Sequence, residues 1–246
     1  MDRLIYVAMT GAKQILEQQA TTANNLANVS TTGFRAQLDA FRAVPVVGAQ
    51  SPTRAFVVDS TVGSDFSTGP IQQTGNTLDI AVQGPGWIAV QRPDGSEGYT
   101  RDGSLKISEN GILQTQSGLD VLGDNGPISI PPDVRVQIAK DGTVSSVQQG
   151  TTPVTSTQLG RIKLVNPDES DLVRNDDGLF STKDGQPADA DANVTIIDGA
   201  VEGSNVNVVN EMVNMISLSR QFDMNMQALK NAESNDTKAD DFLSLS

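Results

Sequence analysis

Apolar residues near the start of the chain recur at alternating steps of four and three positions. The series runs Ile5, Met9, Ala12, Leu16, Gln19, Ala23 and Leu26, and only Gln19 in it is polar. This spacing is a heptad repeat, which predicts a helix that packs lengthwise along another helix. The same spacing returns near the end of the chain in Val208, Met212, Met215, Ser219, Phe222, Met226 and Leu229. Asn207 stands where it can cap the start of this second helix.

Between the two heptad segments the pattern changes to short alternating stretches separated by glycine. Leu78–Val82 and Leu105–Ile107 alternate apolar and polar residues, and Asn110-Gly111 precedes another apolar pair. Asn-Gly between alternating stretches predicts a β-hairpin. Val134–Ile138 and Arg161–Val165 are also predicted strands. Residues 36–77 fit neither pattern and contain three prolines with many small polar residues, so we expect an extended linker or arm there.

The predicted fold class is α+β, with terminal helices that pair like a coiled coil and flank a central all-β domain. Residues 1–35 form the N-terminal helix of an inner domain and residues 36–77 the linker. Residues 78–200 form the β domain and residues 201–246 the C-terminal helix. Isolated helices of this length are marginal in water. One antiparallel pair buries only part of each apolar face, so we expect the termini to need neighbouring subunits.

Composition narrows the classes of function. The chain has 246 residues, 17 Lys and Arg against 30 Asp and Glu, a net charge of −13, and no His or Cys. The negative charge disfavours nucleic acids and anionic membrane surfaces as partners. The missing His and Cys exclude Cys/His zinc sites, thiol nucleophiles and disulfides. No apolar run reaches the roughly 18–20 residues that span a bilayer. Leu4–Met9 is interpreted as the start of the helix rather than a cleaved signal peptide.

Candidate chemistry in the sequence is sparse. Carboxylates are abundant, but no two of them are singled out as an acid/base pair of the kind that glycosidases use. Asp189, Asp191 and Asn193 have the spacing that opens a calcium loop, yet Val194 stands where that loop requires glycine. We therefore expect no catalytic, cofactor-binding or metal-binding residues.

The segment 23–35 is unusual because three of its residues, Asn24, Asn25 and Asn28, are asparagines late in a helix. Their amides can satisfy the end of the helix or contact a neighbouring chain, and Gly33 can supply the positive φ that stops it. This segment resembles the N-terminal signature of bacterial flagellar rod and hook proteins. Three further stretches resemble motifs of that family in the expected order: Leu78–Val90, Tyr99–Gly103 with Leu105, and Glu202–Asn207 followed by 211–216 and 220–222.

The resemblance implies a structural subunit of the flagellar basal-body rod, the hollow shaft that transmits motor torque through the periplasm. It implies other rod proteins and further copies of this chain as partners, and the flagellar type III export apparatus as the route of secretion, without a cleaved signal. The opening Met1–Met9 and the pair Trp87-Ile88 are most similar to a proximal-rod subunit; a distal-rod or hook-type subunit is the alternative. The residues expected to contact neighbouring subunits are Leu16, Asn24, Asn25, Leu26, Asn28, Met215, Phe222 and Leu229.

Two functions of other classes remain open at this point. A carboxylate-based peptidoglycan hydrolase would need two carboxylates that face one cleft. A secreted adhesin would explain the β domain but would leave the two heptad segments without a use.

Overall fold

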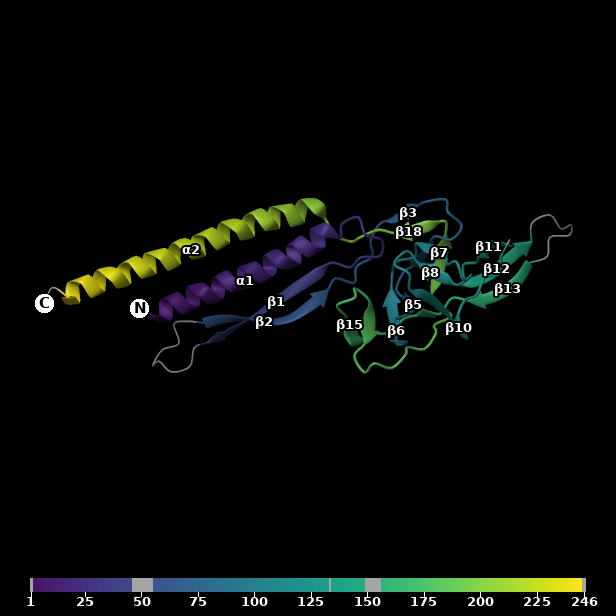
Figure 1. Ribbon diagram of the computed structural model, residues 1–246, viewed down its shortest axis with the longest axis horizontal. Helices are drawn as coiled ribbons and strands as arrows, with labels where there is room; N and C mark the ends of the chain where they lie inside the picture. Colours follow the sequence, from purple (N-terminus) through teal and green to yellow (C-terminus); the bar gives the residue numbers. More distant parts are fainter. Residues whose placement is uncertain (1, 46–54, 133, 149–155, 245–246) are drawn as a thin grey trace. The chain divides into compact units, whose positions relative to one another are not determined.

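A computed structural model of the chain describes residues 2–45, 55–132, 134–148 and 156–244. The chain divides into two compact units. The helical unit comprises Met1–Val29, Ala36–Asp65 and Val206–Ser246, and the β unit comprises Ser30–Arg35 and Phe66–Asn205. The predicted α+β class is confirmed: an N-terminal helix, a central region of many strands and a C-terminal helix follow one another along the chain (Figure 1).

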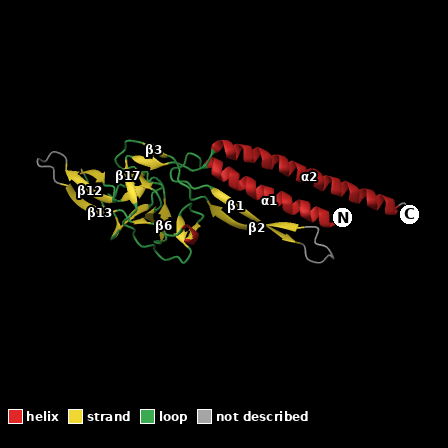
Figure 2. Ribbon diagram, turned by 180° about the vertical axis from the view of Figure 1, so that it is seen from behind, coloured by secondary structure: helices red, strands yellow, loops and turns green. Residues whose placement is uncertain are grey.

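The helical unit contains α1 (Asp2–Ala27) and α2 (Val208–Ser244), which lie side by side in both ribbon views (Figures 1 and 2). They are antiparallel. Gly11 of α1 lies beside Asn225 of α2. Asn25, two residues before the end of α1, lies beside Glu211 near the start of α2. The predicted cap is confirmed, since the Asn207 Oδ1 accepts hydrogen bonds from the amides of Val209 at 3.0 Å and Asn210 at 3.1 Å.

The segment predicted as a linker contains a β-hairpin. Strands β1 (Gln37–Pro45) and β2 (Ala55–Ser64) pair antiparallel in the helical unit, and residues 46–54 lie outside the described residues. Strand β1 alternates in the opposite sense to an ordinary half-buried strand: Gln37 and Asp39 are partly buried, while Leu38 between them is 53% exposed. The usual rule places apolar side chains inward, so it does not detect this strand.

The β unit holds the other strands. In chain order they are β3 (Ile71–Gln73), β4 (Ile80–Gln83), β5 (Trp87–Gln91), β6 (Glu97–Thr100), β7 (Leu105–Ile107), β8 (Leu113–Thr115), β9 (Asp120–Gly123), β10 (Gly126–Pro127), β11 (Val134–Ile138), β12 (Thr143–Gln148), β13 (Ser156–Arg161), β14 (Leu164–Val165), β15 (Leu172–Arg174), β16 (Phe180–Thr182), β17 (Thr195–Asp198) and β18 (Ala200–Glu202). A 3₁₀ turn, Glu169–Asp171, precedes β15.

One nine-stranded sheet follows the order β15-β16-β6-β5-β9-β8-β7, with β10 on β9 and β14 on β5. A three-stranded sheet joins β11, β12 and β13, and two small pairs join β17 with β4 and β18 with β3. The predicted hairpin is confirmed, because β7 pairs antiparallel with β8 across the Asn110-Gly111 turn. The predicted strand Val134–Ile138 is β11, whereas Arg161–Val165 is divided between the last residue of β13 and β14.

Most of the buried apolar side chains of the β unit form one cluster. It includes Ile80, Ile88, Val90, Leu113 and Val144, all 0% exposed. A second, aromatic cluster is built around Trp87, Tyr99 and Phe180. The unit also differs in extent from the predicted domain of residues 78–200, since it takes in Ser30–Arg35 from the segment that was expected to belong with the N-terminal helix. The reason is the position of Arg35, described below.

Candidate subunit-contact surfaces and a buried polar cluster

Some side chains of α2 are shielded from solvent, and they recur at alternating steps of three and four residues. We call this set the inner face of α2. The members are Val208, Glu211, Met215, Leu218, Phe222, Asn225, Leu229 and Ala232. Of the residues predicted for subunit contacts, Met215, Phe222 and Leu229 lie on this face and are partly buried. Two other members of the predicted seam, Met212 and Met226, are 50% and 37% exposed.

The most buried side chains of α1 are Ala12, Gln14, Ile15, Thr22 and Asn25. The predicted contact residue Leu16 is 50% exposed, and Met9 of the predicted seam is 51% exposed. Leu26 is partly buried, and the side chain of Ile5 lies outside the described residues. The sequence pattern selects the large apolar residues, whereas the shielded positions of α1 are mainly small or polar.

The predicted asparagines have separate roles in the structure. Asn25 is 3% exposed, and its amide pairs with the backbone of Gln37: Nδ2 donates to the carbonyl oxygen at 3.0 Å, and Oδ1 accepts from the amide nitrogen at 2.8 Å. Asn28 Nδ2 donates to the Asn24 carbonyl oxygen at 2.9 Å and so satisfies a helix end, as the capping interpretation predicts. Asn24 is exposed. Contact of any of these residues with a neighbouring subunit stays a prediction.

An exposed apolar patch covers the first turns of α2 on the side away from its inner face. Val209 is 68% exposed, Met212 50%, Val213 59% and Ile216 56%. Their positions i, i+3, i+4 and i+7 form one face of a helix. We call these four residues the outer patch. On α1, Tyr6, Met9 and Leu16 are also half or more exposed, and we call them the outer stripe.

A polar cavity of about 320 Å³ lies in the helical unit between α1, α2 and β1. Amide and hydroxyl side chains dominate its lining, and its two carboxylates are Asp39 and Glu211. Thr21 Oγ1 donates to Asp39 Oδ1 at 2.8 Å, and Asn25 Nδ2 donates to Glu211 Oε1 at 3.4 Å. The polar groups of this cavity thus bind one another across the unit.

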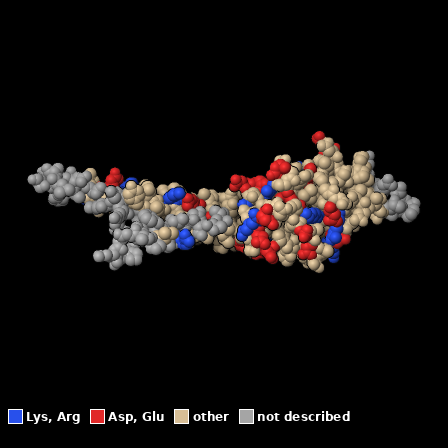
Figure 3. Space-filling view, turned by 90° about the horizontal axis from the view of Figure 1, so that it is seen from below, with Lys and Arg blue, Asp and Glu red and all other residues tan. Residues whose placement is uncertain are grey.

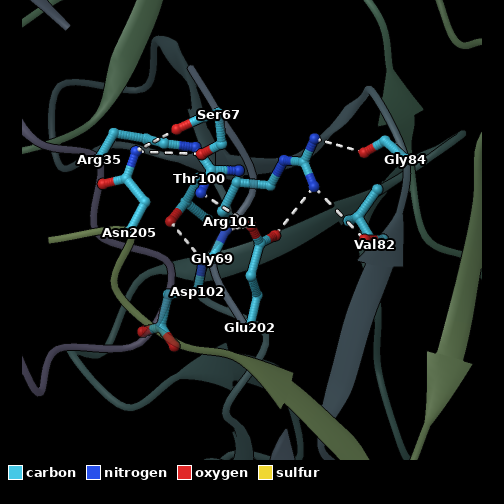
Figure 4. A network of polar contacts seen from close by, with 10 residues as sticks. All are labelled: Arg35, Ser67, Gly69, Val82, Gly84, Thr100, Arg101, Asp102, Glu202 and Asn205. Carbon is cyan, nitrogen blue, oxygen red and sulfur yellow. Dashed lines mark hydrogen bonds and ion pairs between the residues drawn. The ribbon is translucent and has the colours of Figure 1, made fainter. Parts of the chain in front are cut away.

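The β unit encloses a buried cluster of three charged side chains (Figure 4). The exposed fractions of the Arg35, Glu202 and Arg101 side chains are 0%, 1% and 3%. The Glu202 carboxylate lies between the two guanidinium groups: Arg35 Nη1 is 2.7 Å from Oε1, and Arg101 Nη1 is 2.9 Å from Oε2. Glu202 Oε1 also accepts a hydrogen bond from the Gly69 amide at 2.8 Å.

Each of the four sequence stretches that carry the family resemblance contributes to this cluster. Arg35 ends the first, and Arg101 belongs to the stretch Tyr99–Gly103. Arg101 Nη2 donates to the carbonyl oxygen of Gly84, in the stretch Leu78–Val90, at 2.7 Å. Glu202 opens the fourth. The sequence shows the motifs one by one, and the fold shows that they build one buried structure.

Two glycines let the backbones around this cluster approach closely. Gly33 has φ +67°, its amide donates to the Glu202 carbonyl oxygen at 2.8 Å, and a Cβ there would lie 2.2 Å from the Arg101 carbonyl carbon. A Cβ on Gly103 would lie 1.7 Å from the Ile80 carbonyl oxygen. The positive φ expected at Gly33 is therefore present, but Gly33 lies beyond the end of α1 and serves the β unit rather than the helix end.

Burial governs the electrostatics around the cluster. Burial lowers the pKa of the Arg101 guanidinium, while Glu202 opposes that shift. Burial raises the pKa of Asp102, against hydrogen bonds from Thr32 and Ser104 that lower it. Burial also raises the pKa of Tyr99 to about 12. Shifted groups of this kind occur in active sites and in structural ion-pair networks alike.

Among the described residues, no three His, Cys, Asp or Glu side chains are grouped so that they could hold a metal ion. Glu97 and Asp124 line a cavity of about 460 Å³, where Lys163 Nζ lies 2.8 Å from Glu97 Oε2. This ion pair favours a structural role for Glu97. Carboxylates are spread over the surface of the β unit in Figure 3. The described helices include none that is long and apolar enough to cross a membrane.

Comparison with known protein families identifies the class. Residues 5–35 match the family "flagella basal body rod protein", and residues 81–146 match "flagellar hook protein FlgE/F/G D1 domain". Residues 197–241 match "flagellar basal body rod FlgEFG protein C-terminal". The chain belongs to the family of flagellar hook and basal-body rod proteins.

Relatives within the family identify the kind of subunit. The chain is 45% identical to the flagellar basal-body rod protein FlgF of Escherichia coli (strain K12), with 100% of both chains covered. It is 44% identical to FlgF of Salmonella typhimurium, again over 100% of both. A flagellar basal-body rod protein FlgG, from Buchnera aphidicola, is 32% identical over 93% of this chain and 95% of its own length. These findings support a structural rod subunit of the FlgF kind and do not favour the FlgG-like alternative.

Proposed function

We propose that this chain builds the proximal part of the flagellar rod by packing its terminal helices against those of other subunits, including copies of itself. The observation that carries the proposal is the outer patch, Val209, Met212, Val213 and Ile216, which is exposed on one face of α2. Monomeric proteins rarely leave contiguous apolar helix faces open to water, and such faces mark interaction sites.

The energetics favour assembly. Burial of one such side chain contributes about 1.5–3 kcal/mol when it is complete. Because the four residues of the outer patch are each half or more exposed, covering the patch contributes roughly 3–6 kcal/mol per contact. The outer stripe on α1 offers a second apolar surface on the same chain. A contact between two different surfaces is not self-complementary, so it repeats from copy to copy and builds a helical array where the rotation between copies does not close into a ring.

The proposal extends to location and partners. We place the subunit in the rod within the periplasm, where other rod proteins are its neighbours and the shaft transmits torque. We assign its secretion to the flagellar type III export apparatus. Family membership supports both assignments, and the chain without cysteine is compatible with passage through an oxidising compartment. We assign it no catalytic activity, and the Glu97–Lys163 ion pair gives no support to the hydrolase alternative.

The test places one charge in the outer patch. Ile216→Asp is expressed in flagellated cells that lack their own copy, with Asn210→Asp as the matched control, since Asn210 is exposed on α2 outside the patch. Both proteins should be exported and remain helical by circular dichroism. Ile216→Asp should fail to enter the rod and abolish motility, whereas Asn210→Asp should behave as the wild type. Normal rod assembly by Ile216→Asp would contradict the proposal.

A further inference from the structure

The Glu202 carboxylate joins segments that are far apart along the chain. It contacts Arg101, 101 residues earlier, and the Gly69 amide, 133 residues earlier. It also contacts Arg35, in the segment with which the β unit begins. Glu202 itself is the last residue of β18, the last strand before α2. One buried carboxylate therefore binds the first and last segments of the β unit to its middle.

Because of the charge balance, we expect Glu202 to contribute more to the free energy of unfolding than either arginine does. Two buried guanidinium groups share this one carboxylate, and among the described residues Arg35 Nε and Nη2 and Arg101 Nε have no hydrogen-bond partner. Removing Glu202 leaves two buried cations without a counter-charge. Removing Arg35 leaves a one-to-one pair of Arg101 and Glu202. A buried charge without its partner is strongly destabilising, whereas a complete replacement by apolar groups often is not.

The chain entering and leaving the β unit is fixed around the same point. The Asn205 Nδ2 donates to the Ser67 carbonyl oxygen at 3.0 Å and to its Oγ at 3.2 Å, and the Gly203 amide donates to the Pro70 carbonyl oxygen at 2.8 Å. These contacts form only when residues from both ends of the unit are present together. Contacts between residues so distant in sequence require a large loss of chain entropy before they form, so we expect them to form after the more local contacts of the unit.

We propose that the Arg35–Glu202–Arg101 cluster is a closing latch, which completes the β unit last and holds it shut. The latch makes the unit stable only after both its first and its last segments are available. This consequence rests on the proposed function, in which the subunit is exported as an extended chain. The latch can then close only after nearly all of the chain has emerged from the export apparatus, whichever end emerges first. The β unit of a chain still in transit stays easy to unfold.

The chain has a built-in reporter for this cluster. Trp87 is its single tryptophan, 4% exposed, and the Arg35 and Arg101 guanidinium carbons lie 5.8 Å and 5.4 Å from the centre of its ring. Trp87 emission of the purified full-length chain therefore follows the opening of the β unit. The measurement requires neither export nor assembly, so its failure is distinct from failure of the proposed function.

The equilibrium test compares Glu202→Gln with Glu109→Gln, an exposed carboxylate in the same unit. Thermal unfolding is followed by Trp87 emission. Glu202→Gln should lower the unfolding midpoint by roughly 6–20 °C, and Glu109→Gln should leave it nearly unchanged. Equal shifts in the two variants would overturn the latch. Arg35→Met should shift the midpoint less than Glu202→Gln does, because the pair of Arg101 and Glu202 remains. A shift in Arg35→Met as large as that in Glu202→Gln would contradict the charge argument.

A triple variant tests the charge argument. Arg35→Met, Arg101→Met and Glu202→Met together should recover at least about half of the shift produced by Glu202→Met alone, because no unpaired charge is left. A triple variant as unstable as Glu202→Met would overturn the electrostatic basis.

Stopped-flow kinetics test the order of events. Glu202→Gln should speed unfolding at least about tenfold and change refolding by less than about twofold, as expected for a contact absent from the transition state. Slower refolding with unchanged unfolding would show that the contact forms early and would overturn late closure.

Discussion

The two units of this chain distribute apolar and polar residues in opposite ways. The β unit buries its large aliphatic side chains, with Ile88, Val90 and Leu113 at 0% exposure, and carries many acidic side chains on the face that Figure 3 shows. The helical unit shields small and polar groups such as Gln14, Thr22 and Asn25, and exposes Val209 and Ile216. The first arrangement is complete in one chain. The second leaves apolar side chains of α2 exposed to solvent.

This difference separates a unit that is stabilised by contacts within the chain from a unit that leaves apolar surface for contacts with other subunits. In the β unit, hydrophobic burial and the ion-paired cluster act within the chain. In the helical unit, α2 carries apolar residues on two sides, one turned towards its own chain and one towards solvent. A helix that is apolar on more than one face is typical of a buried helix, and the subunit contact proposed above would bury the second face.

The largest expected effect is in the β unit. Gly103→Ala places a Cβ 1.7 Å from the Ile80 carbonyl oxygen, so the backbone must move apart, and the free energy of unfolding should fall by at least about 4 kcal/mol. Gly95→Ala is the control, because a Cβ there meets nothing within 4 Å and only its φ of +85° is unfavourable; about 1 kcal/mol is expected. Urea unfolding followed by Trp87 emission measures both.

A pair of isoleucines compares the two units directly. Ile88→Ala, at 0% exposure in the β unit, should lower the free energy of unfolding by about 2–5 kcal/mol. Ile216→Ala, at 56% exposure in the helical unit, should change it by less than about 0.5 kcal/mol in the isolated chain. Thermal unfolding by circular dichroism provides the measurement. Similar losses in the two variants would remove the contrast between the units.

Polar contacts inside the helical unit should have a smaller but measurable effect. Asn25→Ala leaves the amide and carbonyl of the partly buried Gln37 without these hydrogen bonds, and a loss of about 1–3 kcal/mol is expected. Asn24→Ala, at an exposed neighbouring position, should have an effect below about 0.5 kcal/mol. Helix content during urea unfolding reports on both. An unchanged midpoint in Asn25→Ala would mean that the polar interior contributes nothing to this unit.

The smallest expected effect is a dependence on pH. The pKa of Asp102 is raised above 3.8 by burial, so the folded protein holds its proton to a higher pH than the unfolded chain does. This group therefore stabilises the fold fully below pH 3.8, and that stability is lost as the pH rises through the raised value. The difference in stability between the wild type and Asp102→Asn should change across this window and be flat at neutral pH. Denaturation at several pH values checks it.

The sequence predicted the features that depend on neighbouring residues. The Asn207 cap and the Asn110-Gly111 hairpin each need only a few adjacent positions, and the structure contains both. Local alternation does not predict the hairpin containing Gln37 and Asp39, because these two inward residues are polar and find their partners on α1. Local alternation cannot show a partner that is distant in sequence.

Which residues of the two helices are shielded within the chain is only partly predictable from the sequence, for a related reason, and contact of the predicted residues with other subunits stays a prediction. Met215, Phe222 and Leu229 lie on the inner face of α2, as a heptad of large apolar residues predicts. Leu16 is exposed, since the shielded positions of α1 include Thr22 and Asn25 instead. The motif residues Arg35 and Glu202 lie 167 positions apart in the sequence, and only the fold brings their charges together.

The outer patch has a thermal consequence. Association through apolar surface is driven by the entropy of released water near room temperature, so it strengthens on warming and weakens on cooling. If subunits of the shaft associate through Val209, Met212, Val213 and Ile216, their association is weakest in the cold, while the fold of each subunit loses little stability. Chilling isolated rods should release intact subunits that rejoin when warmed.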